Sequence, residues 1–344
     1  MFGLVVLLSI LLLHRDEKGK ASCFFDLENT TCMRGFWCII ILLVHIPLQY
    51  QNAIQDAIGS FAYIGVTFFF MTSSYGLLLS VEKNPQAMKN GFWKRRLSKL
   101  LIPMVLVNIV RFVAYISIYG IFDWWNLLQV TGFVRQLLFF YLLFWLVFRF
   151  CADRVTLNVK CLIVGVGVVL FSILIYITGG FSIFGWPPES MGFLYGVLLA
   201  RLKEWFFHHM QTRWKLKCAE FCIGSLLLGV FYLKFKWVPF WGDYIVKIFL
   251  GLLILLFILV LNTKISIGNP VSRFLGKISY EVYLIHDVSF LILMGLPFQY
   301  DSGIFILLSI VVTIMISIGV NWITGKTMAM AKSSVRGFRK CQKN

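Results

Sequence analysis

Apolar residues gather along this chain in long blocks, and short polar segments separate the blocks. A helix needs about 20 mostly apolar residues to cross the hydrocarbon core of a bilayer, and lipid forces each crossing segment to satisfy its own backbone hydrogen bonds. The short alternating segments of a β-barrel do not occur. The pattern therefore predicts an all-α, polytopic transmembrane helical bundle with ten core spans. The predicted spans lie near residues 36–50, 60–81, 100–120, 127–148, 159–178, 190–207, 216–233, 244–262, 279–297 and 303–325.

A shorter apolar segment at residues 2–13 comes before the first span. It is too short for a comfortable crossing, and it lacks the positive start of a secretory signal peptide. We expect a short extra helix with its amino end outside, followed by a charged patch. The chain then divides into a short N-terminal apolar helix with a cytoplasmic linker (1–25), a transmembrane domain (26–330) and a basic cytoplasmic tail (331–344).

Composition and charge support this topology. Of the 344 residues, 59% are hydrophobic and 14% are charged, whereas a soluble domain carries roughly a quarter charged residues. The net charge is +17, and 27 of the 32 Lys and Arg fall in one alternating set of loops, against only Lys234 and Lys236 in the other set. The positive-inside rule assigns the basic loops and the C-terminus to the cytoplasm. Since the basic residues are dispersed over many short loops, we expect the bilayer and no nucleic acid as partner.

The eight cysteines agree with this orientation, because none falls in a loop predicted to be external. Reduced, unpaired thiols are therefore expected. No spacing among the Cys and His residues indicates a zinc site, so no metal is predicted.

Ionisable residues inside the spans are few, and each costs at least about 2.5–3.5 kcal/mol to insert. At about 1.5 Å per residue, four of them fall in the middle half of a core about 30 Å thick. These four could line one polar cavity, or each could make a structural contact between helices. Asp287 points about 100° away from His286 on a helix, so we do not pair the two as a dyad. The four are His45, Arg111, Arg135 and His286, and the others are Lys247, Glu281 and Asp287.

Arg34 and His45 form the most informative pair. Eleven residues at about 100° each end about 20° past three full turns, so both side chains share one helix face, about 16 Å apart. A guanidinium suits phosphate groups because its planar fork binds them bidentately, and an imidazole suits a general base. A donor with phosphates in the cytoplasm and a thioester at the end of a pantetheine arm would fit this spacing.

Residues 26–45, which contain this pair, resemble the opening of the acyltransferase 3 family, whose signature is Arg, ten residues, His. Three further blocks resemble the family in the right order, and residues 133–135 match more weakly. Ser74 stands where Gly is usual, Phe133 where Trp is, and Lys99 where Arg is frequent. The three further blocks are residues 65–76, 92–103 and 275–286.

The resemblance implies an enzyme that transfers an acyl group, usually acetyl from cytoplasmic acetyl-CoA, to a hydroxyl of an envelope glycan or lipid-linked sugar in the bacterial inner membrane. Acyl-CoA is then a co-substrate, and no bound cofactor is expected. By this resemblance His45 is the catalytic base and Arg34 helps to hold the donor. Residues implied to bind the donor phosphates are Arg95, Arg96 and Lys99, and those implied to line the acyl or acceptor site are Ser73, Arg111, Arg135 and His286.

Several alternatives stay open. Mid-membrane His and Arg could serve a secondary transporter or channel, or the chain could be an inactive partner in polysaccharide export. Ordinary positive-inside anchoring could explain the basic loop at residues 95–99, and a helix contact could explain Ser73. Direct transfer and an acyl-histidine intermediate are both compatible with the residues. The aromatics at 186–189 and 237–241 could stack on sugar rings or form an interfacial belt.

Overall fold

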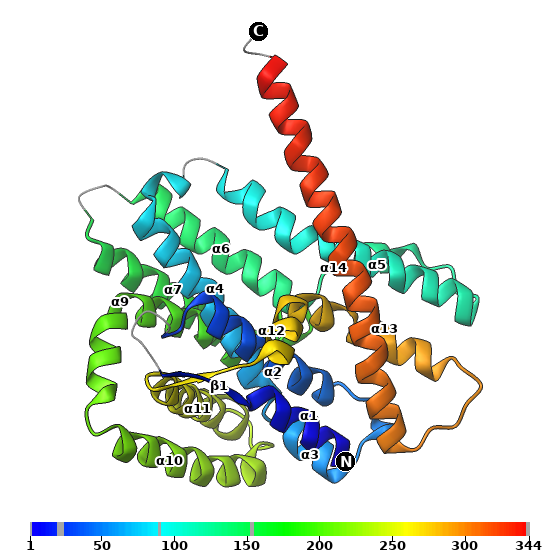
Figure 1. The fold of residues 1–344 in the computed structure, drawn as a ribbon, viewed down its shortest axis with the longest axis horizontal. Helices are drawn as coiled ribbons and strands as arrows, with labels where there is room; N and C mark the ends of the chain where they lie inside the picture. Colours follow the sequence, from blue (N-terminus) through cyan, green and yellow to red (C-terminus); the bar gives the residue numbers. More distant parts are fainter. Residues whose placement is uncertain (1, 19–23, 89–90, 152–154, 342–344) are drawn as a thin grey trace. The chain divides into compact units, whose positions relative to one another are not determined.

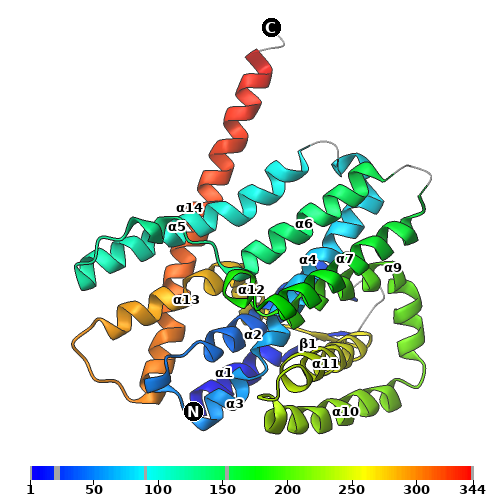
Figure 2. The ribbon, with the colours of Figure 1, turned by 180° about the vertical axis from the view of Figure 1, so that it is seen from behind.

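The computed structural model describes residues 2–18, 24–88, 91–151 and 155–341 of the 344-residue chain. Two compact units share the chain. The first unit comprises Met1–Val44, Asn52–Asn90 and Thr131–Lys277, and the second comprises His45–Gln51, Gly91–Val130 and Ile278–Asn344. Figures 1 and 2 show the ribbon from two sides.

The first unit contains most of the helices and a small two-stranded sheet. Its α-helices and strands are α1 (Phe2–Leu12), β1 (His14–Lys18), α2 (Leu27–Val44), α3 (Ala53–Gly59), α4 (Ala62–Lys83), α6 (Gly132–Phe150), α7 (Leu157–Thr178), α8 (Phe181–Phe184), α9 (Met191–Gln211), α10 (Trp214–Phe235), α11 (Lys247–Asn262), β2 (Ile265–Ile267) and α12 (Pro270–Lys277). Short turns of 3₁₀-helix lie at η3 (Pro85–Met88) and η5 (Pro187–Ser190), and a π-helical turn, η6 (Trp241–Val246), leads into α11.

The second unit is built on three long helices. These are α5 (Phe92–Tyr119), α13 (Ser279–Met294) and α14 (Ser302–Cys341), with short 3₁₀ turns at η2 (Leu48–Tyr50) and η4 (Trp124–Leu127). The three helices pack against one another, and α14 is the red helix of Figure 1. It runs through residue 341 and so includes most of the segment 331–344 predicted as the basic tail.

Each of the ten predicted spans folds as helix, but the count of ten crossings is not confirmed. Within the described residues, eight helices are long and apolar enough to cross a membrane. The helices α9 and α13 fall outside this set. The first carries Arg201, Lys203 and Glu204 in its C-terminal half, and the second has only 16 residues. Boundaries also moved: the predicted span 36–50 is α2, which begins at Leu27 and ends at Val44.

The N-terminal segment is more ordered than the predicted helix and linker. Residues 2–12 form α1, and the charged residues that follow form β1, which pairs antiparallel with β2. The amide of Asn269, at the start of α12, donates to the carbonyl of Ile10 at 2.5 Å. A purely α-helical prediction therefore missed a small sheet, because β1 consists only of polar and charged residues and β2 has three residues, so neither carries a readable alternation of apolar and polar positions.

Helices α4 and α9 pack at very short range because α9 presents two glycines one turn apart. A Cβ on Gly192 would lie 2.0 Å from the Thr67 carbonyl oxygen, and one on Gly196 would lie 2.0 Å from the Ser74 hydroxyl. Small residues spaced four apart let helix backbones approach closely in membranes. Gly196 thus makes room for Ser74, which stands where the resemblance leads one to expect glycine.

The cysteines described in the structure are unpaired. Cys32, Cys38, Cys151, Cys161, Cys218 and Cys222 are free thiols. Cys23 and the side chain of Cys341 lie outside the described part of the chain.

Candidate active site

Two histidines meet in the second unit. His45 stands in the turn directly after α2, and His286 lies on α13. Their ring centroids are 4.7 Å apart, with the ring planes inclined by 47°. The Nδ1–H of His286 donates to the Tyr283 carbonyl oxygen at 2.7 Å, because a carbonyl can only accept. The lone pair of His286 is therefore on Nε2, which is the nitrogen able to take a proton.

Arg111 of α5 makes the strongest electrostatic contact of this unit. Its Nη2 lies 2.6 Å from Oδ2 of Asp287, the residue that follows His286 on α13. The Arg111 side chain is only 6% exposed, whereas that of Asp287 is 53% exposed. The ion pair thus joins α5 to α13 beside the two histidines. Asp287 pairs with Arg111 and not with His286, consistent with its different direction on the helix.

Amide side chains complete the surroundings of Arg111. Its Nη1 donates to Asn108 Oδ1 at 3.0 Å and to Gln129 Oε1 at 2.9 Å. The Asn108 amide in turn donates to the carbonyl oxygens of Leu127 and Gln129, and the Gln129 amide donates to Asn126 Oδ1. This network fixes the loop after α5 to the helix, because every strongly polar group in it has a partner.

Helix α5 also links this network to the predicted donor loop. It is a single helix from Phe92 to Tyr119 and contains Pro103. Arg95, Arg96 and Lys99 lie in its first turns, and Lys99 is about 18 Å from Arg111 along the axis at 1.5 Å per residue. The hydroxyl of Tyr280 donates to the Leu100 carbonyl at 2.9 Å and ties this part of α5 to α13.

Helix α13 packs against α14 through polar and aromatic contacts. Asn321 of α14 donates to the buried Glu281 carboxyl at 3.0 Å. His286 packs against Phe290, which packs against Phe305 of α14. The Tyr50 ring, five residues after His45, stacks on Phe305 at 3.7 Å. Both histidines are therefore connected to one aromatic cluster.

Arg34 lies on α2 in the first unit. Its Nη2 donates to the Thr31 hydroxyl at 3.1 Å, and its Nε is buried without a hydrogen-bond partner among the described residues. None of the ion pairs found in the described part of the chain involves Arg34. Its guanidinium therefore keeps donor capacity for a ligand.

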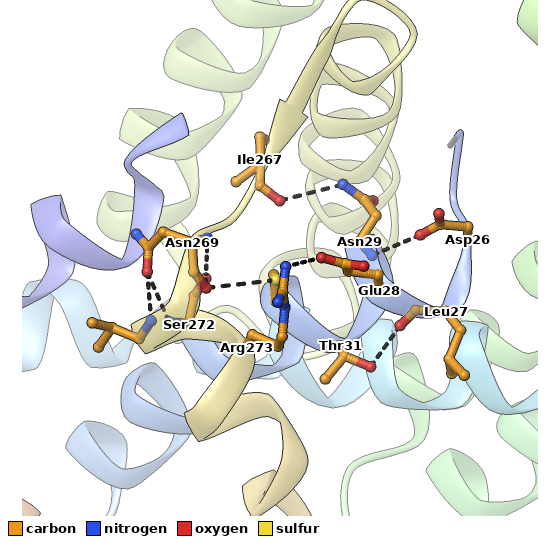
Figure 3. Close-up of polar contacts among 11 residues, drawn as sticks. Asp26, Leu27, Glu28, Asn29, Thr31, Ile267, Asn269, Ser272 and Arg273 are labelled. Atoms are coloured by element: carbon orange, nitrogen blue, oxygen red, sulfur yellow. Dashed lines mark hydrogen bonds and ion pairs between the residues drawn. The ribbon is translucent and has the colours of Figure 1, made fainter. Parts of the chain in front are cut away.

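The start of α2 is fixed by the polar contacts drawn in Figure 3. Asp26 accepts from the Asn29 backbone N–H at 2.7 Å and caps the helix. The Asn29 side chain exchanges hydrogen bonds with Asn262 of α11 and donates to the Ile267 carbonyl. Figure 3 also shows the ion pair of Arg273 with Glu28, which joins α12 to α2.

Glycines let α12 approach α2 directly beside Arg34. A Cβ on Gly276 would lie 1.8 Å from the Thr31 carbonyl oxygen, and one on Gly35 would lie 2.1 Å from the Ser272 carbonyl oxygen. The two helices lie side by side in Figures 1 and 2. The Gly-Lys-x-Ser-Tyr block at residues 276–280 therefore has a packing role at its first position.

The helix-face arithmetic for Arg34 and His45 does not describe the structure. It assumed helical backbone through residue 45, but α2 ends at Val44. His45 is the first residue after α2, so the 20° offset no longer follows from helix geometry alone. The sequence could not show this, because the next breaker, Pro47, lies two residues further on.

Ser73 and Arg135 also lie in the first unit, each with a protein contact. The Tyr141 hydroxyl of α6 donates to the Ser73 hydroxyl oxygen at 3.4 Å. Arg135 donates from Nη1 to the Ile183 carbonyl of α8 at 2.6 Å. Both contacts join helices of this unit. Among the described residues, no group of three or more His, Cys, Asp or Glu could hold a metal ion.

The structure therefore brings His45 and His286 together and places Arg111 beside them through Asp287. Sequence reasoning noted Asp287 as an intramembrane charge but did not find its partner. It missed Asn108 and Gln129 entirely. The available signal was the presence of one acid and one arginine in different spans, since buried charges in membranes are usually paired.

Comparisons with known proteins agree with the resemblance. The family Acyl_transf_3, an acyltransferase domain, matches residues 28–324. Proteins named "Putative O-acetyltransferase" from Staphylococcus aureus strains COL, MSSA476 and MRSA252 are 28% identical to the chain over 305 residues. The match covers 74% of this chain and 49% of each relative, so the chain spans about half the length of these relatives. No solved structure matches the chain.

Proposed function

This chain belongs to the acyltransferase 3 family, and we propose that it moves an acyl group, in the simplest case acetyl, from cytoplasmic acyl-CoA to a hydroxyl of an envelope glycan or lipid-linked sugar. The family and the apolar helices make it a membrane O-acyltransferase at the coarse level. The donor, the acceptor and the bacterial inner membrane as its location are the proposed parts.

The contact between His45 and His286 is the observation that carries the proposal. Acyl transfer to a hydroxyl needs a base that takes the hydroxyl proton, and imidazole is the side chain best matched to that task near neutral pH. The rings are 4.7 Å apart, and the tautomer of His286 is fixed by Tyr283. One imidazole can therefore act on the reacting hydroxyl while the other lies within reach of the same proton.

In the proposed reaction, one bond forms and one breaks at the carbonyl carbon of the thioester. His45 takes the proton of the acceptor hydroxyl as its oxygen bonds to the thioester carbonyl carbon. The carbon–sulfur bond then breaks, and the thiolate of CoA leaves with the proton from the imidazolium. The products are an O-acyl ester and free CoA. A route through acyl-histidine uses the same groups in two steps.

Fixed positive charge would stabilise the oxyanion that forms between these steps. Arg111 is the candidate beside His286. Its hydrogen bonds to described residues use both hydrogens of Nη1 and one of Nη2. The remaining N–H groups on Nη2 and Nε are the ones that could face a reacting oxygen. Ser73 and Arg135 are proposed more weakly, as residues that line the acyl or acceptor path.

Phosphate groups of the donor need cations at the cytoplasmic side. Arg34 has unused N–H capacity, including a buried Nε. Arg95, Arg96 and Lys99 lie together in the first turns of α5. Each unit thus has its own candidates for the donor phosphates, Arg34 in the first unit and the basic residues of α5 in the second, because guanidinium groups bind phosphate bidentately and an ammonium adds a point charge.

The test uses the purified full chain in detergent with acetyl-CoA and measures CoA release and ester formation. His45→Ala should lower turnover about 10²–10⁴-fold, the usual contribution of a general base. His208→Ala is the matched control, because that histidine side chain is 73% exposed on α9. Normal turnover by a folded His45→Ala protein would refute the assignment.

A further inference from the structure

The first unit contains an apolar cavity of about 150 Å³ between α4, α9 and α11. Its walls include Met71 of α4 and Leu252 and Leu259 of α11. On α9 the lining runs from Tyr195 to Phe206, a length of about 16 Å at 1.5 Å per residue. Apart from the Tyr195 hydroxyl and the Met71 sulfur, the side chains that line it are hydrocarbon.

The cavity has the size and the surroundings for one hydrocarbon chain. A dry cavity of about this volume, lined by apolar side chains, accepts a benzene-sized molecule, so a short stretch of a chain fits. Two of its lining residues, Leu198 and Leu202, are 46% and 48% exposed. The cavity is therefore open on the α9 side, while its opposite wall, α11, belongs to a helix apolar enough to cross a membrane.

A polar cluster adjoins the outer end of the cavity. The Tyr195 hydroxyl donates to the Ile248 carbonyl at 3.5 Å, one residue beyond Lys247 at the start of α11. The Lys247 ammonium lies 4.9 Å from the ring centroids of both Tyr63 and Trp186. The ion pairs found among the described residues do not include Lys247. A cation between two rings, without a carboxylate in contact, is available to an anionic ligand.

Two further groups belong to this cluster, the hydroxyl of Tyr63 and the carboxyl of Glu189. The Tyr63 hydroxyl is buried and makes no hydrogen bond within the described residues. Burial raises the pKa of Glu189, in η5, to about 7, although the charge of Lys247 opposes the shift. Asp243 also acts electrostatically on Lys247, and Glu189 acts on Tyr232. Near neutral pH the cluster therefore offers an ammonium, a phenol and a carboxyl that is only about half ionised.

We propose that the first unit binds a single-chain lipid phosphate of the polyprenyl phosphate class, with its chain in this cavity and its phosphate at Lys247 and Tyr63. The ammonium and the phenolic O–H are donors for phosphate oxygens. One cavity accepts one chain, which favours this class over a two-chain phospholipid. Combined with the proposed function, on which this last step rests, the site makes a lipid-linked sugar the acceptor.

The binding test uses the full chain in detergent, titrated with a long-chain polyprenyl phosphate and followed by native mass spectrometry. Lys247→Met removes the cation, and Leu252→Trp fills the cavity. Each should weaken binding at least about tenfold, or 1.4 kcal/mol. Matched controls on α10 are Lys234→Met and Leu227→Trp, both at exposed positions. They should bind within about twofold of the unchanged protein.

Two competition arms use the unchanged protein, so they do not depend on how the variants fold. Phosphatidylglycerol and inorganic phosphate should displace the polyprenyl phosphate poorly. Equal competition by phosphatidylglycerol would mean ordinary bilayer contact, and equal competition by phosphate would mean that the chain contributes nothing. Either result overturns the site, as does unchanged binding by both variants.

Acyl transfer measured on the same samples separates the two proposals. Lipid binding without any acyl transfer would refute the proposed function and leave the site standing. Acyl transfer to a water-soluble glycan by a protein that binds no polyprenyl phosphate would refute the site and leave the function standing.

Discussion

Two arginines inside membrane helices are held in opposite ways in the two units. In the second unit, Arg111 gives hydrogen bonds to Asn108, Gln129 and Asp287, and its side chain is 6% exposed. In the first unit, Arg34 has one hydrogen bond, to Thr31, and a buried Nε without a partner in the described part of the chain. Arg111 thus has most of its hydrogen-bond partners within the protein, whereas Arg34 has few.

This difference distinguishes an arginine that stabilises the fold from an arginine that binds a ligand. A charged group that is taken out of water and fully paired contributes to the fold, and removing it leaves its partners unpaired. A buried charged group without hydrogen-bond partners lowers the stability of the ligand-free protein. Such a group is kept where a bound ligand supplies the missing partners. Arg111 should therefore matter for stability and Arg34 for the donor.

The largest effect is expected where α2, which carries Arg34, packs on α12 through glycines. Gly276→Ala puts a methyl group 1.8 Å from the Thr31 carbonyl oxygen, and the helices must separate. We expect a loss of about 3 kcal/mol, at the upper end of overpacking effects, in denaturant unfolding. Gly319→Ala is the control, because nothing lies within 4 Å of its added Cβ. If both variants lose the same stability, glycine packing does not hold α2.

Arg111→Met and Arg34→Met test the comparison itself by thermal unfolding in detergent. The first should lose about 1–3 kcal/mol, because the amides of the network lose a buried partner. The second should change stability by no more than about 0.5 kcal/mol. Equal losses in the two variants would contradict the division between a structural and a ligand-binding arginine.

Donor titration sharpens the role of Arg34. Arg34→Met should raise the KM for acyl-CoA about tenfold, with a smaller change in turnover at saturating donor. Arg34→Lys should recover only part of this, since a point charge lacks the guanidinium fork. An unchanged KM in Arg34→Met would make Arg34 a topology anchor only.

The smallest effect concerns pH and the first unit alone. Burial raises the pKa of Glu189 from 4.5 to about 7 in the folded protein, with Lys247 opposing. The folded state then binds this proton more tightly than the unfolded state, so stability is highest below pH 4.5 and falls as pH rises through 7. Between pH 6 and 8 the loss is about 1 kcal/mol. Glu189→Gln should flatten the dependence, and an equal slope in both proteins would show that the carboxyl does not titrate there.

The sequence predicted the helices well because long apolar blocks have one stable solution in lipid. It also identified both histidines and both arginines, since charges are rare in such blocks. The pairing of Arg111 with Asp287 was out of reach, because these residues lie 176 positions apart and depend on which helices pack together. The end of α2 before His45 was missed for the opposite reason, because it depends on only a few residues. The β1–β2 pair was missed on both grounds, since its strands are short and it joins His14 to Ile267.

The contacts of α2 with α11 and α12 have a consequence for biosynthesis. Asn29 and Asn262, which exchange two hydrogen bonds, are 233 residues apart in the chain. At synthesis rates of about 5–20 residues per second, α2 waits roughly 10–50 s for this partner to be made. During that interval its glycine face and Arg34 have no α12 to cover them. Insertion factors that shield polar helix faces should therefore act on α2 during this interval.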